Sequence, residues 1–177
     1  SDGAGGGASP PATLEATDPG SEEEGGGEVP PKLGRIAVRV KNAASNPATR
    51  TILTDKLDEW RRTIGINLEA VYVGSKLVVP HMVKQEQGRI IHIASIQGFA
   101  SSGECGSYNA AKGAVIAYTK SMAVELGRYN ILVNAGAPGF MATPMSVGNG
   151  VDEATTPDFV EWDVDRRKIP TGRTGHP

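Results

Sequence analysis

Three residues near the middle of the chain, Ser95, Tyr108 and Lys112, are of the types that move a proton between an alcohol and a carbonyl. Tyr108 and Lys112 stand four positions apart, so in a helix their side chains lie on one face. An ammonium beside a phenol favours the phenolate. Lowering a tyrosine pKa from ~10 to near neutrality takes a shift of roughly 2–3 units, or ~3–4 kcal/mol. The Ser95 hydroxyl follows an apolar run and can donate to a substrate oxygen.

The spacing Tyr-x-x-x-Lys alone usually means a core tyrosine and a surface lysine, so the interpretation depends on the rest of the chain.

A length of 177 residues predicts one domain. A net charge of −2, with no basic face, argues against nucleic acid as a partner. Cys105 is the only cysteine, which excludes an internal disulfide and fits a reducing compartment. No apolar run approaches the ~20 residues that span a bilayer. We expect a soluble cytoplasmic protein with no membrane partner and no metal.

Residues 1–34 differ in composition from the rest of the chain. They are dense in glycine and proline and carry the acidic run Glu22-Glu23-Glu24. Such a segment buries too little apolar surface to offset its ordering entropy, so we expect it to be disordered. Its glycine clusters are flanked by proline and glutamate, whereas a dinucleotide-binding loop follows an apolar strand and opens a helix. The predicted domain therefore spans residues 35–177.

From Arg35 onward, apolar strands alternate with helical patterns. The predicted elements are strands at 36–40, 89–94 and 131–135 and helices at 54–79 and 107–126. Thr54 is the expected N-cap of the first helix, and Pro80 its expected stop. Near-continuous apolar strands of this kind predict an α/β fold, a parallel β-α-β-α-β sheet with helices on both faces.

Each predicted strand is followed by polar residues or by residues that leave the backbone accessible to a ligand. They are Asn42-Ala43 after the first, Ser95 after the second and Pro138-Gly139 after the third. Ligands of open α/β sheets bind outside the carboxyl ends of the strands, and Tyr108 opens the helix after the second strand, so it faces the same edge. By position alone, Gln97, Phe99, Met141 and Met145 are candidate pocket residues. We expect His92 to pack on a neighbour and Cys105 to be an inert thiol.

With these features in view, residues 35–177 resemble the short-chain dehydrogenase/reductase family. The resemblance is carried by Asn42-Ala43-Ala44, Ile66-Asn67-Leu68, the set Ser95, Tyr108 and Lys112, and the segment Asn134, Pro138-Gly139 and Thr143. It implies a partial Rossmann-like fold, NAD or NADP as cofactor, and an alcohol or carbonyl compound as substrate. A sugar, a polyol or a 3-oxoacyl compound would each be ordinary.

The resemblance also implies roles. Ser95 would hydrogen-bond the substrate, Tyr108 would be the general acid/base, and Lys112 would lower the tyrosine pKa and bind the nicotinamide ribose. Asn67 would anchor a water of the proton relay through its main chain. Asn42, Ala43, Pro138, Gly139 and Thr143 would contact the cofactor, and Gln97 and Met141 would join Ser95 and Tyr108 around the substrate. The helices at 54–79 and 107–126 would form the interface of a homo-oligomer.

The chain departs from the family pattern at both ends. The first strand and the loop T-G-x-x-x-G-x-G are absent from this sequence, Lys41 and Ala44 replace an Asn and a Gly, and the pattern runs on beyond residue 177. The strands at 36–42 and 131–137 are then open apolar edges that favour self-association. Two interpretations follow. One is an oxidoreductase, and the other is a catalytically impaired fragment that pairs with a full-length homologue without turnover.

Overall fold

The computed structural model describes residues 38–41, 50–143, 146–148 and 151–176. The main elements are β1 (Val38–Lys41), α2 (Leu57–Ile64), a π-helical segment (Gly65–Glu69), α3 (Ala70–Lys84), β2 (Gly88–Ile93), α4 (Gly106–Leu126) and β3 (Ile131–Gly136). The expected disorder of residues 1–34, the cofactor candidates Asn42 and Ala43, and the pocket candidate Met145 lie outside the described residues.

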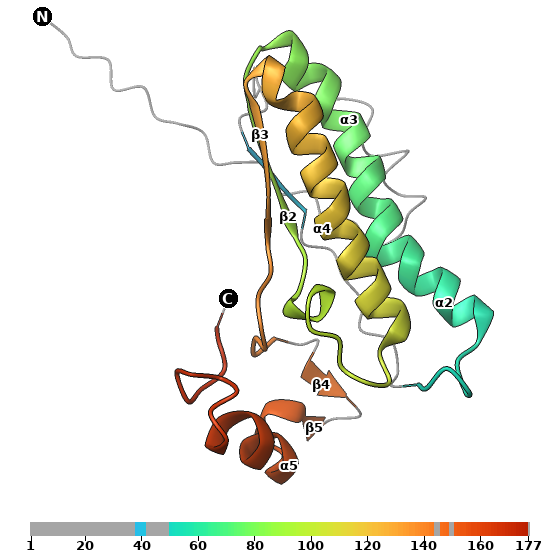
Figure 1. The fold of residues 1–177 in the computed structure, drawn as a ribbon, viewed down its shortest axis with the longest axis vertical. Coiled ribbons are helices and arrows are strands. Elements are labelled where there is room, and N and C mark those ends of the chain that lie inside the picture. Colours follow the sequence, from blue (N-terminus) through green and yellow to red (C-terminus); the bar gives the residue numbers. More distant parts are fainter. Residues whose placement is uncertain (1–37, 42–49, 144–145, 149–150, 177) are drawn as a thin grey trace, which may run out of the picture.

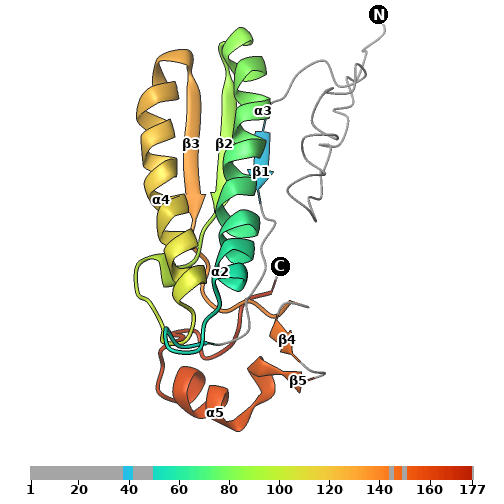
Figure 2. The same ribbon diagram turned by 90° about the vertical axis from the view of Figure 1, so that its right-hand side faces the viewer.

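The three longer strands form one parallel sheet in the order β1-β2-β3, as expected (Figures 1 and 2). The register pairs Val40 with Ile91 and Ile91 with Asn134. Each strand is joined to the next by a helix, so the α/β prediction is confirmed. In the described part of the chain, β1 and β3 are the outer strands of this sheet, which are the two expected edges.

The expectation of helices on both faces is wrong for the described residues, because α3 and α4 lie on the same side of the sheet (Figure 1). Ile90 and Val133 on that face are buried, whereas Val38, Val40 and Leu132 on the opposite face are about half exposed. The strand order explains the arrangement. Both connections step in the same direction across the sheet, and right-handed crossovers then place both helices on one face. Apolar strand composition does not reveal this.

The first long helix departs from its predicted bounds at both ends. It begins at Leu57 without a side-chain cap, because the Thr54 hydroxyl bonds back to the Thr51 carbonyl at 3.4 Å. It also continues through Pro80 to Lys84. A proline removes one helical hydrogen bond, but Met82 in the turn beyond it is fully buried, and that packing holds the last turn in place. The second helix matches its predicted bounds within a residue.

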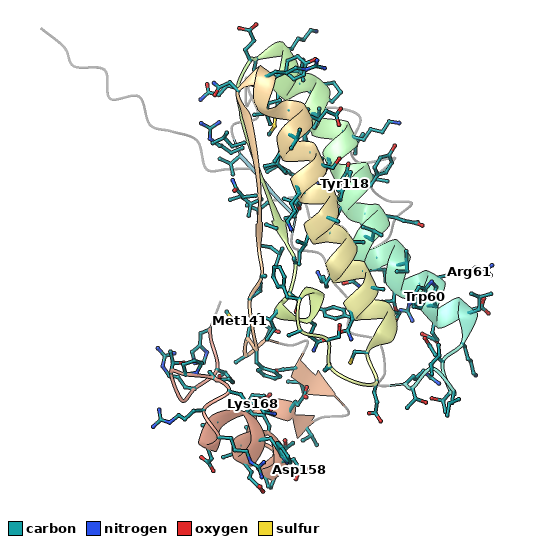
Figure 3. All side chains as sticks on the ribbon, viewed as in Figure 1. Trp60, Arg61, Tyr118, Met141, Asp158 and Lys168 are labelled. Carbon is teal, nitrogen blue, oxygen red and sulfur yellow. The ribbon has the colours of Figure 1, made fainter. Side chains whose placement is uncertain are left out.

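His92 ties the sheet to both helices, as a buried packing residue. Its Nδ1 lies 2.9 Å from the Thr119 hydroxyl of α4, and its Nε2 lies 3.1 Å from the Ser75 hydroxyl of α3. The ring also stacks on Tyr118, which lies between α3 and α4 in Figure 3. Burial lowers the His92 pKa from 6.5 to about 4. The ring is therefore neutral at physiological pH.

This buried histidine predicts acid sensitivity. The unfolded chain takes up a proton near pH 6.5 and the folded chain only near pH 4, so stability is lost as the pH falls through that window. The loss amounts to about 3 kcal/mol. Urea unfolding at several pH values checks it, with His92→Phe as the control because phenylalanine keeps the stacking and cannot titrate. If the free energy of unfolding depends on pH equally in the parent chain and in His92→Phe over this window, His92 is not the group responsible.

The C-terminal segment lies beyond the carboxyl ends of the strands (Figures 1 and 2). It contains β4 (Val147–Gly148), β5 (Val151–Asp152), α5 (Pro157–Phe159) and a π-helical turn (Val160–Asp165). Thr156 caps α5 by accepting from the Phe159 amide at 3.3 Å, as the Thr-Pro pair suggests. The Phe159 ring packs on Phe140 at 4.4 Å between centroids. Among the described residues, no helix is long and apolar enough to cross a membrane.

Candidate active site

Ser95 is fixed at the carboxyl edge of the sheet by backbone pairing that continues past the strands. The Ala94 amide donates to the Gly136 carbonyl at 2.7 Å, and the Ile96 amide donates to the Pro138 carbonyl at 3.1 Å. The Ser95 hydroxyl accepts from the Gln97 amide at 3.2 Å and caps a 3₁₀ turn, Ile96–Gly98. The structure therefore places the candidate serine directly beside the Pro138 segment, as their positions after adjacent strands predict.

Tyr108 lies in the first turn of α4, and the Ser95 side chain is near enough to favour its phenolate form by a hydrogen bond. Its pKa is raised above 10, because burial disfavours the phenolate more than the Ser95 hydrogen bond favours it, and the nearby Cys105 adds to the rise. This is opposite to the expected direction. The expected cause, the Lys112 ammonium, lies near the ring face, 5.5 Å from the centroid.

Lys112 is almost completely buried, with 2% of its surface exposed. Its Nζ donates to the Ile93 carbonyl at 2.9 Å, so the ammonium is tied to the end of β2 rather than to the phenol. Burial lowers its pKa from 10.5 to about 8. The ammonium therefore stays mostly charged at neutral pH. The sequence gives no signal for the Ile93 contact, because it is made by a backbone carbonyl.

Asn67 is fully buried in the π-helical segment Gly65–Glu69 between α2 and α3. Its side-chain amide donates to the Thr63 carbonyl at 3.1 Å. A π-helical turn widens the spacing of the backbone hydrogen bonds and is common at functional sites. Glycine weakens a helix by ~1 kcal/mol relative to alanine, and the π-helical turn begins at Gly65.

The remaining candidates differ in how well they fit the site. Gln97 is partly buried, and among the described residues no donor reaches its Oε1 atom. Phe99 is 70% exposed. Met141 pairs with Gly175 in a short parallel bridge and lies above the C-terminal segment that carries Lys168 (Figure 3). Thr143 is half-buried, and its backbone carbonyl accepts from the Ser146 amide at 2.9 Å.

The family model described as short chain dehydrogenase matches residues 11–154 of this chain. The chain belongs to that family. The match begins within the segment that precedes Arg35, ahead of the expected domain boundary. In the described residues, no group of three or more His, Cys, Asp or Glu side chains could hold a metal ion.

Individual relatives agree with the family assignment. The chain is 38% identical over 169 residues to a 3-oxoacyl-[acyl-carrier-protein] reductase of Thermotoga maritima, covering 94% of this chain and 64% of the relative. It is 32% identical over 164 residues to a meso-2,3-butanediol dehydrogenase of Serratia marcescens, covering 93% and 61%. It also resembles a gluconate 5-dehydrogenase of Burkholderia cenocepacia solved with NADP and tartrate, with a TM-score of 0.74, 29% identity and coverage of 82% and 55%. The chain spans less than two thirds of the length of each.

Proposed function

We propose that this chain carries the proton-transfer half of an NAD(P)-dependent oxidoreductase that interconverts a secondary alcohol and a carbonyl compound. The observation that carries the proposal is the grouping of Ser95, Tyr108 and the buried Lys112 ammonium at the carboxyl edge of a parallel sheet. Two hydroxyls and one cation at one point suit a substrate oxygen that gains or loses a proton. A cytoplasmic location is part of the proposal, and cell fractionation checks it.

In the reductive direction, the Ser95 hydroxyl donates to the carbonyl oxygen and orients it. The Tyr108 hydroxyl is protonated at neutral pH, and burial raises its pKa further above its usual value. It delivers its proton to the same oxygen as the alcohol forms. Lys112 then stabilises the phenolate that remains, and Asn67 supports a water that returns the proton. Gln97 Oε1, to which none of the described residues donates, is available to accept a hydrogen bond from a second hydroxyl on the substrate.

The residues present fit the nicotinamide half of the cofactor. The Lys112 ammonium has three hydrogens, and the Ile93 carbonyl takes one of them, which leaves donors for the hydroxyls of a ribose. Pro138 and Gly139 follow β3 at the same edge, and Thr143 lies shortly after them. When bound, the cofactor supplies or removes the hydride, and the chain supplies orientation and proton transfer.

The direct test is hydride transfer. The purified chain is mixed with excess NADH or NADPH and three carbonyl classes, namely 2-hydroxyketones, keto-sugar acids and 3-oxoacyl thioesters. Loss of reduced cofactor and formation of alcohol should occur together, and Lys112→Met should remove both. A chain that forms no alcohol with any of these, even at millimolar cofactor, would count against an oxidoreductase.

We also propose that the helices at 54–79 and 107–126 associate with a second copy or a full-length homologue. Apolar side chains lie open on these helices, including Leu57 at 61% exposure, Tyr72 at 48% and Val124 at 87%. Val124→Glu should reduce association in sedimentation velocity, whereas Val151→Glu on β5 should not. If Val40→Lys at the sheet edge dissociates the protein and Val124→Glu does not, the open edge is the contact instead. An associating but inactive chain would favour the non-enzymatic alternative.

A further inference from the structure

We propose that Gly98 is a positioning residue that sets the distance between Ser95 and Tyr108, an inference that rests on the proposed function. Gly98 ends the 3₁₀ turn that Ser95 caps, and this turn packs directly on α4. Glycine is required at this position because there is no room for a side chain, and not because the backbone conformation excludes other residues. Among the described glycines, only Gly172 has a positive φ, so alanine could adopt the Gly98 backbone conformation.

The space around Gly98 leaves no room for a methyl group. A Cβ built on it would lie 2.9 Å from both the carbonyl carbon and the carbonyl oxygen of Lys112, and 2.7 Å from the Ile116 Cδ1 atom. The isoleucine tip can move aside. The Lys112 carbonyl belongs to the backbone of a 21-residue helix and cannot. An alanine at position 98 therefore has to lift the turn away from α4.

Lifting the turn moves Ser95, because the two ends of the turn are linked. The Gly98 amide donates to the Ser95 carbonyl at 3.0 Å, and the Gln97 amide donates to the Ser95 hydroxyl at 3.2 Å. Tyr108 and Lys112 stand on α4 and do not follow the turn. The close contact between Gly98 and the Lys112 backbone therefore fixes the position of the turn relative to α4. The turn carries Ser95, and α4 carries Tyr108 and Lys112.

The predicted consequence is a change in Tyr108 ionisation. The Ser95 hydrogen bond lowers the Tyr108 pKa, so a displaced Ser95 leaves that pKa higher than in the parent chain. The shift in Gly98→Ala should equal the shift in Ser95→Ala. Combining the two substitutions should add nothing further. A general loss of stability would not produce this pattern, because it acts on unfolding and not on one phenol.

The experiment follows the Tyr108 ring carbon by NMR across a pH titration of the full chain. Four tyrosines are present, and Tyr108→Phe identifies the signal. Gly103→Ala is the matched control, because a Cβ there meets nothing within 4 Å in the same connection between β2 and α4. It should leave the titration unchanged.

Two further variants locate the contact. Ile116→Val removes the Cδ1 atom, and in the Gly98→Ala chain it should not restore the parent titration, because the clash with the Lys112 backbone remains. Restoration would assign the contact to the Ile116 side chain and overturn the proposal. If Gly98→Ala does not fold, Gly113→Val serves instead. The Gly113 Cβ position is already 3.5 Å from the Gly98 carbonyl oxygen, so a branched side chain pushes the turn from the helix side and should raise the same pKa.

The outcomes separate this inference from the proposed function. An unchanged Tyr108 titration in Ser95→Ala would remove the Ser–Tyr pair itself, and both proposals with it. A raised pKa in Ser95→Ala with a parent-like pKa in folded Gly98→Ala would overturn the role of Gly98 alone. Equal and non-additive shifts in the two variants are the result we expect.

Discussion

Turnover in the Tyr108→Phe variant is expected to fall by ~10²–10⁴-fold, the usual contribution of a general acid or base. The substitution removes only a hydroxyl, so the ring keeps its packing at the start of α4. What is lost is the hydroxyl near Ser95 that would deliver the proton to the substrate oxygen. Single-turnover measurements at saturating cofactor isolate this step from binding.

Tyr72→Phe provides the control for the Tyr108 variant. The Tyr72 hydroxyl is on α3, where Lys76 Nζ lies 3.3 Å from it, and none of the proposed proton-transfer steps uses it. Its turnover should match that of the parent chain. Because burial raises the Tyr108 pKa, carbonyl reduction should be favoured at neutral pH, and alcohol oxidation should quicken as the pH rises. Near-normal reduction by Tyr108→Phe would remove tyrosine as the proton donor.

The sequence was sufficient to predict the parallel sheet and the edge at which the site lies. Apolar strands separated by helices leave few other topologies, and the carboxyl ends of such strands share one edge. Ser95, Pro138 and Tyr108 could therefore be placed together before their contacts were known. The same reasoning could not say which face the helices cover, since that depends on the order of the strands and the hand of the connections.

The direction of the Tyr108 pKa shift could not be predicted from residue types. A lysine four residues after a tyrosine lies on the same helix face, but the spacing does not predict which group the ammonium contacts. Here the Ile93 carbonyl holds Lys112 Nζ, and burial becomes the larger influence on the phenol. The role of Gly98 is likewise not predictable from residue types. A glycine three residues after Ser95 suggests only a turn, and the close contact with Lys112 requires both elements in place.

The fold therefore follows from patterns that recur along the chain, whereas the chemistry of the site depends on single contacts between distant segments. Helix ends show the same distinction. Thr156 caps its helix as local sequence predicts, while burial of Met82 extends α3 past Pro80 against the local signal. Where packing and local preference disagree, packing decides.

Cofactor affinity is the property for which this chain should differ most from its longer relatives. These 177 residues contain no stretch of the form T-G-x-x-x-G-x-G. The family resemblance implies that such a loop holds the pyrophosphate with backbone amides at a helix N-terminus. The proposed contacts that remain, from Lys112, Pro138, Gly139 and Thr143, are all on the nicotinamide side. Losing two or three charge-assisted hydrogen bonds, at ~1.5–3 kcal/mol each, weakens binding by roughly 10²–10⁶-fold.

Calorimetry on the 177-residue chain should accordingly show NADH and NADPH dissociation constants in the millimolar range or weaker. Fragments of the cofactor make the test specific. Nicotinamide mononucleotide should bind about as well as the whole dinucleotide, because the contacts that this chain retains lie on that half, and Lys112→Met should weaken both equally. ADP should not bind detectably. Micromolar affinity for NADH together with measurable binding of ADP would mean that residues of this chain build a phosphate site without the glycine-rich loop, and the assignment of the cofactor contacts to the nicotinamide side alone would then be wrong.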